Sequence, residues 1–176
     1  MKKDIKSLSL DEILTWIKAN ELPAYRAKQI YEWLHKYGVA DFSEMSNISK
    51  DLKNSLSNEF YISVCSVEDK FVSAVDGTVK YLFQLNDGEF VESVIMKYKY
   101  GYTICVSSQV GCKMGCRFCA STLAGFKRNL TAGEIESQIH TEQKDLDIMI
   151  SHIVLMGIGE PLYNFEQVIR FISNVN

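Results

Sequence analysis

The sequence predicts an α/β protein: a small N-terminal helical domain and a β-rich linker, followed by the first two strand–helix units of an incomplete parallel α/β architecture. Three observations lead to this prediction. Apolar residues recur with a helical period in residues 1–60, alternate with polar residues in 61–100, and form two strand–helix pairs in 101–176. Those ranges are the three expected domains. Two parallel strands cannot bury both faces of a sheet, so the chain is expected to be a piece of something larger.

Residues 1–60 are expected to contain three helices. Ser9-Leu-Asp-Glu12 has the form of a capping box, so a first helix is predicted from there to about Asn20. A third, shorter helix is predicted after Ser49. Periodicity leaves open whether this domain only packs or also binds a partner.

The second helix is predicted over residues 25–37. Ile30, Leu34 and Tyr37 fall on one stripe of this helix. Gly38 follows as a C-terminal stop, because glycine readily adopts the left-handed conformation that ends helices.

The pattern changes at Tyr61 to the two-residue period of β-strands. Asp-Gly pairs at positions 76–77 and 87–88 indicate turns. Glu92 interrupts the last strand of this segment, and the pattern alone places it on the solvent face. The predicted strands are Ile62–Val67, Phe71–Val75, Val79–Leu85 and Phe90–Met96.

Residues 101–176 alternate between strands and helices. Thr131-Ala-Gly-Glu134 is a second capping box. Ser151–Met156 is almost continuously apolar, which is typical of a buried parallel strand. The predicted order is a strand at Tyr102–Ser107, a helix from Thr131 to about Lys144, a strand at Ser151–Met156, a loop at Gly157–Pro161, and a helix capped by Asn164 that ends near Ser173.

Composition restricts the class of protein. The 176 residues are 47% hydrophobic and 23% charged, as in a globular soluble protein. No apolar run approaches the roughly 18 residues of a membrane span, and no signal peptide is recognisable. The five cysteines are an odd, clustered set that a disulfide framework would not use, so a reducing, cytoplasmic location is expected.

Three of the cysteines indicate a metal centre. Cys112, Cys116 and Cys119 are separated by gaps of three and two residues, which suit one loop that wraps thiolates around an iron–sulfur cube. With three cysteine ligands, the fourth iron of such a cube is open to another ligand. Zinc is the alternative, but zinc sites usually have a fourth Cys or His in range, and no His lies between Cys119 and His140. The remaining alternative is three incidental buried thiols, and the cluster is the favoured interpretation.

The Gly157–Pro161 loop follows the second strand of residues 101–176. The loop that carries Cys112, Cys116 and Cys119, here called the cysteine loop, follows the first. Reactive groups gather at the carboxyl ends of parallel strands, so both loops are expected at the same end of the sheet. Gly157 and Gly159 would let backbone approach a ligand, and Glu160 could accept hydrogen bonds from an amine. A Gly-x-Gly alone is a weak signal.

The charge of the chain is segregated. Residues 93–133 contain no acidic residue, although the net charge is −3. Basic and aromatic side chains interleave there, which favours contact with a polyanion such as RNA. The alternative is a solvated face whose counter-charges lie elsewhere in the fold. The basic residues are Lys97, Lys99, Lys113, Arg117, Lys127 and Arg128.

These motifs resemble a known family. Cys-x3-Cys-x2-Cys followed by Gly-Glu-Pro resembles the radical S-adenosylmethionine (SAM) enzymes. More narrowly, the chain resembles the RlmN/Cfr family, whose members methylate adenine carbons in RNA. The resemblance implies that the incomplete α/β architecture is the truncated start of a radical SAM partial TIM barrel. The segments that carry this resemblance are Val91–Val94, Cys105–Cys112, Arg128–Thr131 and Met156–Leu162.

The resemblance implies two cofactors. Cys112, Cys116 and Cys119 would hold a [4Fe-4S] cluster, and Gly159 and Glu160 would contact SAM. It also implies 23S rRNA and tRNA as partners, together with an electron donor such as flavodoxin. No membrane partner is implied.

The resemblance also assigns two catalytic residues. Cys105 matches the cysteine that forms a transient disulfide to release the methylated RNA. Glu92 matches the proposed proton acceptor, which replaces the surface interpretation of that residue. Cys65 matches no catalytic position and is expected to be a small core residue.

The expected function is therefore methylation of adenosine C2 in 23S rRNA and tRNA through a methyl-cysteine intermediate. The family's methyl-accepting cysteine has no counterpart in this sequence, so the chain alone is expected to be inactive. Three alternatives remain: a Cfr-like enzyme that methylates C8, a non-catalytic RNA-binding module, and a purely structural metal site. Pro161 after Gly159-Glu160 favours C2 over C8.

Overall fold

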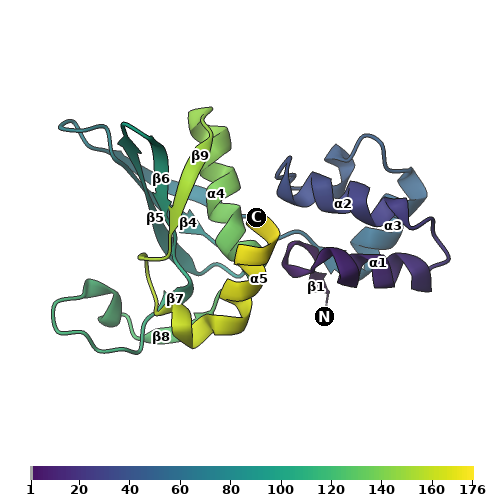
Figure 1. The fold of residues 1–176 in the computed structure, drawn as a ribbon. Coiled ribbons are helices and arrows are strands. Elements are labelled where there is room, and N and C mark those ends of the chain that lie inside the picture. The colour runs from purple at the N-terminus through teal and green to yellow at the C-terminus, as the bar shows by residue number, and fades with distance from the viewer. Residues whose placement is uncertain (1) are drawn as a thin grey trace.

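The computed structural model describes residues 2–176 and consists of a helical unit and a sheet unit (Figure 1). Each unit has its own hydrophobic core. Helices α4 (Ala132–Leu146) and α5 (Phe165–Val175) stand between the sheet and the helical unit in Figure 1. This mixed architecture confirms the predicted α/β class.

Three helices build the helical unit, namely α1 (Leu10–Ala19), α2 (Tyr25–His35) and α3 (Lys50–Glu59). The predicted capping box is present, since Ser9 accepts from the Glu12 amide and Glu12 accepts from the Ser9 amide. Ser49 caps α3 through the Leu52 amide. The expected starts of α1 and α3 are therefore confirmed.

Helix α2 ends two residues earlier than predicted, and Tyr37 does not continue its buried stripe. Ile30 and Leu34 are fully buried, whereas Tyr37 is 51% exposed. Gly38 has φ +58°, which turns the chain so that Val39 enters the core, where it is only 2% exposed. The apolar position assigned to Tyr37 is thus filled by Val39.

The helical unit is closed by a short parallel pairing of β1 (Lys3–Asp4) with β2 (Phe60–Tyr61). This pairing brings the start of the unit beside its end. The chain then crosses to the sheet unit through residues 62–65, which are not in a strand.

The sheet has five strands in the order β3-β4-β5-β6-β9. Strands β3 to β6 are antiparallel neighbours, and β6 pairs parallel with β9. Because the strands of residues 66–98 pair directly with β6, they extend the same sheet. The strands are β3 (Ser66–Val72), β4 (Val79–Gln84), β5 (Phe90–Tyr98), β6 (Gly101–Cys105) and β9 (Ile150–Val154).

The predicted strands 62–67 and 71–75 were wrong as separate elements, since one strand, β3, replaces them. Ile62 packs in the core of the helical unit, and the Ser63 amide donates to Asp4. This stretch therefore belongs to the segment that connects the helical unit to the sheet unit. Val75 is 96% exposed in the turn before β4. The two Asp-Gly turns are confirmed by positive φ at Gly77 and Gly88.

The predicted alternation of strand and helix is confirmed in β6, α4, β9 and α5, with Thr131 and Glu134 forming the capping box of α4. Strand β9 is shorter than predicted and only partly buried, with Ser151 and His152 exposed. It lies at the end of the described sheet and has a single neighbouring strand, which explains the exposure.

Two further features were not predicted. A small antiparallel pair, β7 (Gln109–Gly111) and β8 (Phe126–Asn129), brackets the cysteine loop. The predicted capping of α5 by the Asn164 side chain was wrong, since Asn164 stands at the N-cap but makes no capping hydrogen bond. Its amide instead donates to the carbonyl oxygens of Ser108 and Leu130, each at 2.8 Å.

The two faces of the sheet have different surroundings. Val91, Ser93 and Ile95 of β5 are buried on the face that packs against α4. The intervening residues, including Glu92 and Val94, are only partly buried on the opposite face. Glu92 therefore points away from the core that holds the sheet unit together.

Polar contacts join the two units through α4. Lys6, which is 2% exposed, donates from Nζ to Ser137 Oγ and to the Ser63 carbonyl oxygen, both at 3.2 Å. Asp4 accepts from Thr131 Oγ1 at 2.9 Å. Burial lowers the pKa of Lys6 and raises that of Asp4. These buried polar contacts favour one particular docking of the units.

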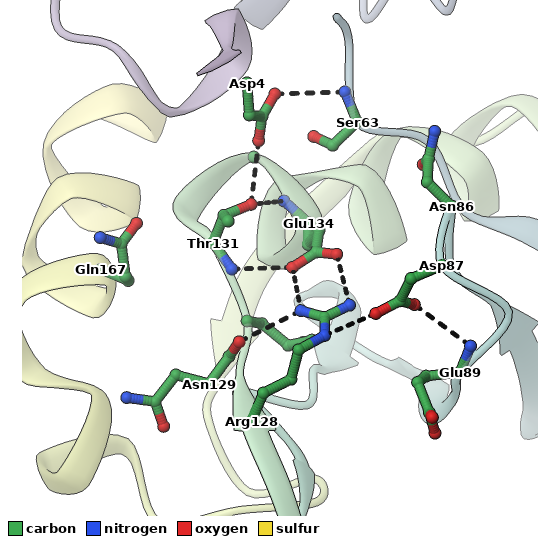
Figure 2. A network of polar contacts seen from close by, with 12 residues as sticks. Asp4, Ser63, Asn86, Asp87, Glu89, Arg128, Asn129, Thr131, Glu134 and Gln167 are labelled. Atoms are coloured by element: carbon green, nitrogen blue, oxygen red, sulfur yellow. Dashed lines mark hydrogen bonds and ion pairs between the residues drawn. The ribbon is translucent and has the colours of Figure 1, made fainter. Parts of the chain in front are cut away.

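An arginine on β8 connects several of these elements (Figure 2). Arg128 makes two hydrogen bonds of 2.8 Å to the Glu134 carboxylate and one of 2.7 Å from Nε to Asp87. Glu134 also accepts from the Thr131 amide, and Thr131 in turn contacts Asp4. The base of the cysteine loop, the β4–β5 turn, the start of α4 and the helical unit thus form one network.

One acidic side chain is buried without a partner. Glu142 of α4 is fully buried, and neither carboxyl oxygen has a hydrogen-bond partner among residues 2–176. Burial raises the pKa of Glu142 to about 8. The folded protein therefore holds Glu142 protonated at neutral pH.

No helix in the described part of the chain is long and apolar enough to cross a membrane.

Substitution of Glu142 tests the consequence for stability. The folded state binds a proton that the unfolded state releases above about pH 4.5, so stability falls as pH rises from there through about 8. Glu142→Gln removes that loss, and we expect urea unfolding to show a gain of about 3 kcal/mol at pH 7. At pH 5 the gain should be small. The exposed Glu68→Gln should show no such pH-dependent gain, and an equal response of both variants would contradict this assignment.

Substitution of Arg128 tests the network at the base of the loop. Arg128→Met leaves the Glu134 carboxylate, whose side chain is 7% exposed, without its cation. Loss of one partner from a buried pair is costly, and because Arg128 is partly exposed we expect a loss of about 2 kcal/mol in urea unfolding. Arg117→Met, at an arginine with no ion pair among the described residues, is the matched control. Equal stability of the two variants would refute the proposed importance of this network.

Candidate functional site

The residues singled out from the sequence lie around the carboxyl ends of β6 and β9. Cys105 is the last residue of β6, and the chain continues through β7 into the cysteine loop. The Gly157–Pro161 loop begins three residues after the end of β9. The two strands are parallel, so both loops leave the sheet at the same end, as expected (Figure 1).

Backbone hydrogen bonds between residues 106–109 and 157–160 join the two loops, and we call this contact the seam. The Gly157 amide donates to the Val106 carbonyl oxygen at 3.1 Å, and the Ser108 amide donates to the Ile158 carbonyl oxygen at 2.9 Å. A Cβ on Gly157 would lie 2.7 Å from the Val106 backbone, so only glycine permits this approach. The glycine that was expected to approach a ligand therefore approaches the chain itself.

Side chains strengthen this seam. Ser107 Oγ donates to the Glu92 carbonyl oxygen at 2.5 Å and accepts from the Ile158 amide at 2.9 Å. Gln109 Oε1 accepts from the Glu160 amide at 2.9 Å. Ser107 and Gln109 thus link β5, the segment before the cysteines and the glycine loop. Sequence reasoning missed both, although polar residues that directly follow an apolar strand could have indicated them.

Gly159 and Glu160 occupy the outer part of the glycine loop. Gly159 has φ +106°, and a Cβ there would lie 2.6 Å from the Gln109 side chain. The Glu160 carboxylate accepts from the Leu162 amide at 3.1 Å and caps the following short turn. Both residues therefore have local structural partners at the mouth of the site.

The β7–β8 pair holds together the two ends of the cysteine loop, which we call its neck. The Cys112 amide donates to the Gly125 carbonyl oxygen at 3.2 Å. Gly111 has φ +71°, and any Cβ there would overlap the Gly125 carbonyl oxygen. The close approach at Gly111 sets where the loop departs from the sheet.

The three cysteines of the loop are free thiols. Cys112 is buried at the neck, Cys119 is partly buried and Cys116 is exposed. Within residues 2–176 no three His, Cys, Asp or Glu side chains lie close enough to hold one metal ion. The donor set suits an iron–sulfur cluster, because three unpaired thiols share one loop. The thiols would have to converge on binding.

Glu92 lies beside this loop. Its carboxylate pairs with Lys80 Nζ at 2.7 Å, and its side chain is 41% exposed. It lines a cavity of about 380 Å³ together with Ser121 of the cysteine loop and Ile158 of the glycine loop. The structure thus brings Glu92 together with both loops, on the open face of the sheet.

Cys105 shares this face. It pairs with Val94 across β5 and β6, and residues paired across strands point to the same side, so Cys105 lies on the side of Glu92. The thiol is free and half-buried, and burial raises its pKa. By contrast, Cys65 is a buried core residue, as expected, and burial raises its pKa to about 12.

Part of the predicted basic surface is neutralised within the fold. Lys127 pairs with Glu89 at 2.7 Å, and Arg128 with Asp87 and Glu134. These acidic partners lie outside the acid-free stretch. The four remaining cations have no ion pair among residues 2–176: Lys97, Lys99, Lys113 and Arg117.

Comparison with known proteins agrees with this organisation. Residues 3–62 match the family model described as the ribosomal RNA large subunit methyltransferase N-terminal domain. The chain is 51% identical over 174 residues to the "Probable dual-specificity RNA methyltransferase RlmN" of Clostridium novyi (strain NT), with 99% of this chain and 51% of that protein covered. A protein of the same name from Clostridium perfringens (strain SM101 / Type A) is 54% identical, with 99% and 50% covered.

A solved structure is also similar. The crystal structure of a radical SAM methyltransferase from Sphaerobacter thermophilus matches with a TM-score of 0.88 and 34% sequence identity, and the match covers 98% of this chain and 52% of that one. The chain spans about half the length of the curated relatives it matches. The sequence likeness to the Clostridium novyi protein extends over 99% of this chain, and residues 3–62 carry the match to the N-terminal domain model.

Proposed function

We propose that this chain is part of a radical SAM enzyme that methylates C2 of adenosine in 23S rRNA and tRNA. The observation that carries the proposal is the convergence of Glu92, Cys105, the cysteine loop and the Gly157–Pro161 loop at one end and on one side of the sheet. The relatives named above as dual-specificity RNA methyltransferases support the choice of substrate.

In this proposal Cys112, Cys116 and Cys119 hold a [4Fe-4S] cluster, and Gly159 and Glu160 contact SAM. Bound together, these groups would supply the radical chemistry needed at a carbon that is neither acidic nor nucleophilic. The seam between residues 106–109 and 157–160 supports the assignment, because it holds both loops in fixed relation. A convergence of the three thiols accompanies cluster binding.

Glu92 accepts the proton that leaves the adenine ring. Its carboxylate is partly exposed on the open face, where a base could reach it, and its ion pair with Lys80 fixes where the carboxylate lies. Lys80 is therefore a positioning residue for Glu92.

Cys105 would attack the sulfur that links the RNA to the methyl-carrying cysteine: an S–S bond forms, the bond from that sulfur to the carbon on the adenine breaks, and the carbon takes the electron pair and a proton to become the methyl group. The position of Cys105 on the face of Glu92 supports this role. A thiol with a raised pKa is a poor nucleophile, so the reaction requires removal of its proton at that step.

The wider setting follows from the same proposal. The partners are 23S rRNA, tRNA and an electron donor such as flavodoxin, and the location is the cytoplasm. Five free thiols, which a reducing compartment preserves, support that location.

Anaerobic reconstitution with iron and sulfide tests the cofactor assignment. We expect an absorbance band at roughly 400 nm from thiolate–iron charge transfer. Cys116→Ala should abolish the band, because it removes one of the three ligands. Cys65→Ala is the matched control and should retain it, since Cys65 lies in the core. Zinc binding without iron, or a full band in Cys116→Ala, would refute the cluster.

The nature of the product tests the reaction. An enzyme completed with the remaining length found in the RlmN relatives should yield C2-methyladenosine in 23S rRNA and tRNA, measured by mass spectrometry of digested RNA. Glu92→Gln should lower the rate at least about a hundredfold, as expected for loss of a general base. Formation of C8-methyladenosine would instead assign the chain to the C8-methylating branch.

A further inference from the structure

Two tyrosines form a rigid, exposed pair at the β5–β6 hairpin, at the opposite end of the sheet from the cysteine loop. The rings of Tyr98 and Tyr100 are stacked, with centroids 5.1 Å apart and planes within 8°. They are 44% and 64% exposed. Tyr100 also contacts the ring of His152 edge-on at 5.0 Å. The two rings are therefore fixed by each other and by β9 while they remain open to solvent.

One cationic side chain lies between the two tyrosines in the sequence. Lys99 has no ion pair among the residues that the structure describes. Lys97 pairs with Tyr102 and lies over its ring, so it is on the opposite face of the sheet from Tyr98. No acidic residue occurs between positions 93 and 133, so the hairpin supplies no counter-charge of its own. We call Tyr98 to Tyr100 the hairpin platform.

The hairpin platform is within reach of a ligand that also occupies the candidate site. Residues 90–98 pair continuously with β4 and then β6, without a bulge in β5. Side chains alternate along a strand, so Tyr98 emerges on the same face as Glu92. Six residues separate the two, which corresponds to about 20 Å of strand. A flexible polymer of a few nucleotides spans this distance.

We propose that the hairpin platform binds a single-stranded segment of RNA that flanks the base held near Glu92. Bases stack on the Tyr98–Tyr100 pair, and Lys99 neutralises a phosphate. Exposed aromatic rings beside cations are the usual basis of single-strand binding. A protein partner fits less well, because lysine is depleted in protein–protein interfaces. The inference rests on the proposed function, which makes RNA the substrate.

Binding of a fluorescein-labelled, mixed-sequence RNA 12-mer, followed by anisotropy, tests this proposal on the chain without reconstitution. Tyr98→Leu/Tyr100→Leu retains apolar area but removes stacking, and it should weaken binding by about tenfold or more. Tyr98→Phe/Tyr100→Phe retains the rings and should bind as the parent chain does. Tyr25→Leu is the matched control, since Tyr25 is 57% exposed and lies beside Arg26, and it should change nothing.

The lysines provide a second measurement that does not depend on the tyrosines. Lys99→Gln should reduce the slope of log affinity against log salt by about 0.7, for the one phosphate that it no longer neutralises, whereas Lys97→Gln on the opposite face is the matched control and should leave the slope unchanged. Ultraviolet crosslinking followed by peptide mapping should place RNA on residues 98–100. Thermal melts of all variants establish that they are folded.

Three outcomes would overturn the proposal: unchanged affinity in both the leucine variant and Lys99→Gln, crosslinks confined to other segments, or a self-association of the parent chain that the leucine variant abolishes. None of these outcomes depends on the cluster. A chain that assembles the cluster but binds RNA equally well with either variant would refute the hairpin platform and leave the proposed function intact. A chain that fails to assemble the cluster but still binds RNA at the hairpin would refute the proposed function and leave the hairpin platform intact.

Discussion

The seam between residues 106–109 and 157–160 is the contact on which the candidate site depends. It continues the parallel pairing of β6 and β9 beyond the strands, through backbone hydrogen bonds that require glycine at position 157. Ser107 extends it to the backbone of Glu92, and Gln109 extends it to Glu160. The segment before the cysteines, the glycine loop and β5 are consequently held in one arrangement before any ligand binds, whereas the three thiols converge on binding.

Polar contacts rather than a shared apolar core join the helical unit to this arrangement. Asp4 meets Thr131 at the start of α4, and Arg128 and Glu134 continue the network to the base of the cysteine loop. Buried ionic and polar contacts add little net stability, but they penalise every arrangement that leaves a partner unpaired. This explains how a domain with its own core keeps a fixed position relative to the cysteine loop, and why a few substitutions would alter that position.

The local features of this fold could be predicted from the sequence, whereas the long-range ones could not. Capping boxes at Ser9 and Thr131 depend on residues three positions apart, so the pattern contains all that is needed. Asn164 has the residue type of a cap, yet its amide serves two carbonyl oxygens of distant segments. At the site, the cysteine spacing indicated a metal centre, but the contacts of Gly157 and the ion pairs of Arg128 depend on segments that sequence periodicity cannot place together.

The central claim is that one loop of three thiols holds a cluster whose fourth iron is open. Mössbauer spectroscopy of the chain, reconstituted anaerobically with isotopically enriched iron, tests it most directly. We expect a [4Fe-4S] signal in which one iron differs from the three that carry cysteine, and a further change at that iron when SAM is added. A spectrum without cluster iron, or one in which all four irons are equivalent and insensitive to SAM, would contradict it.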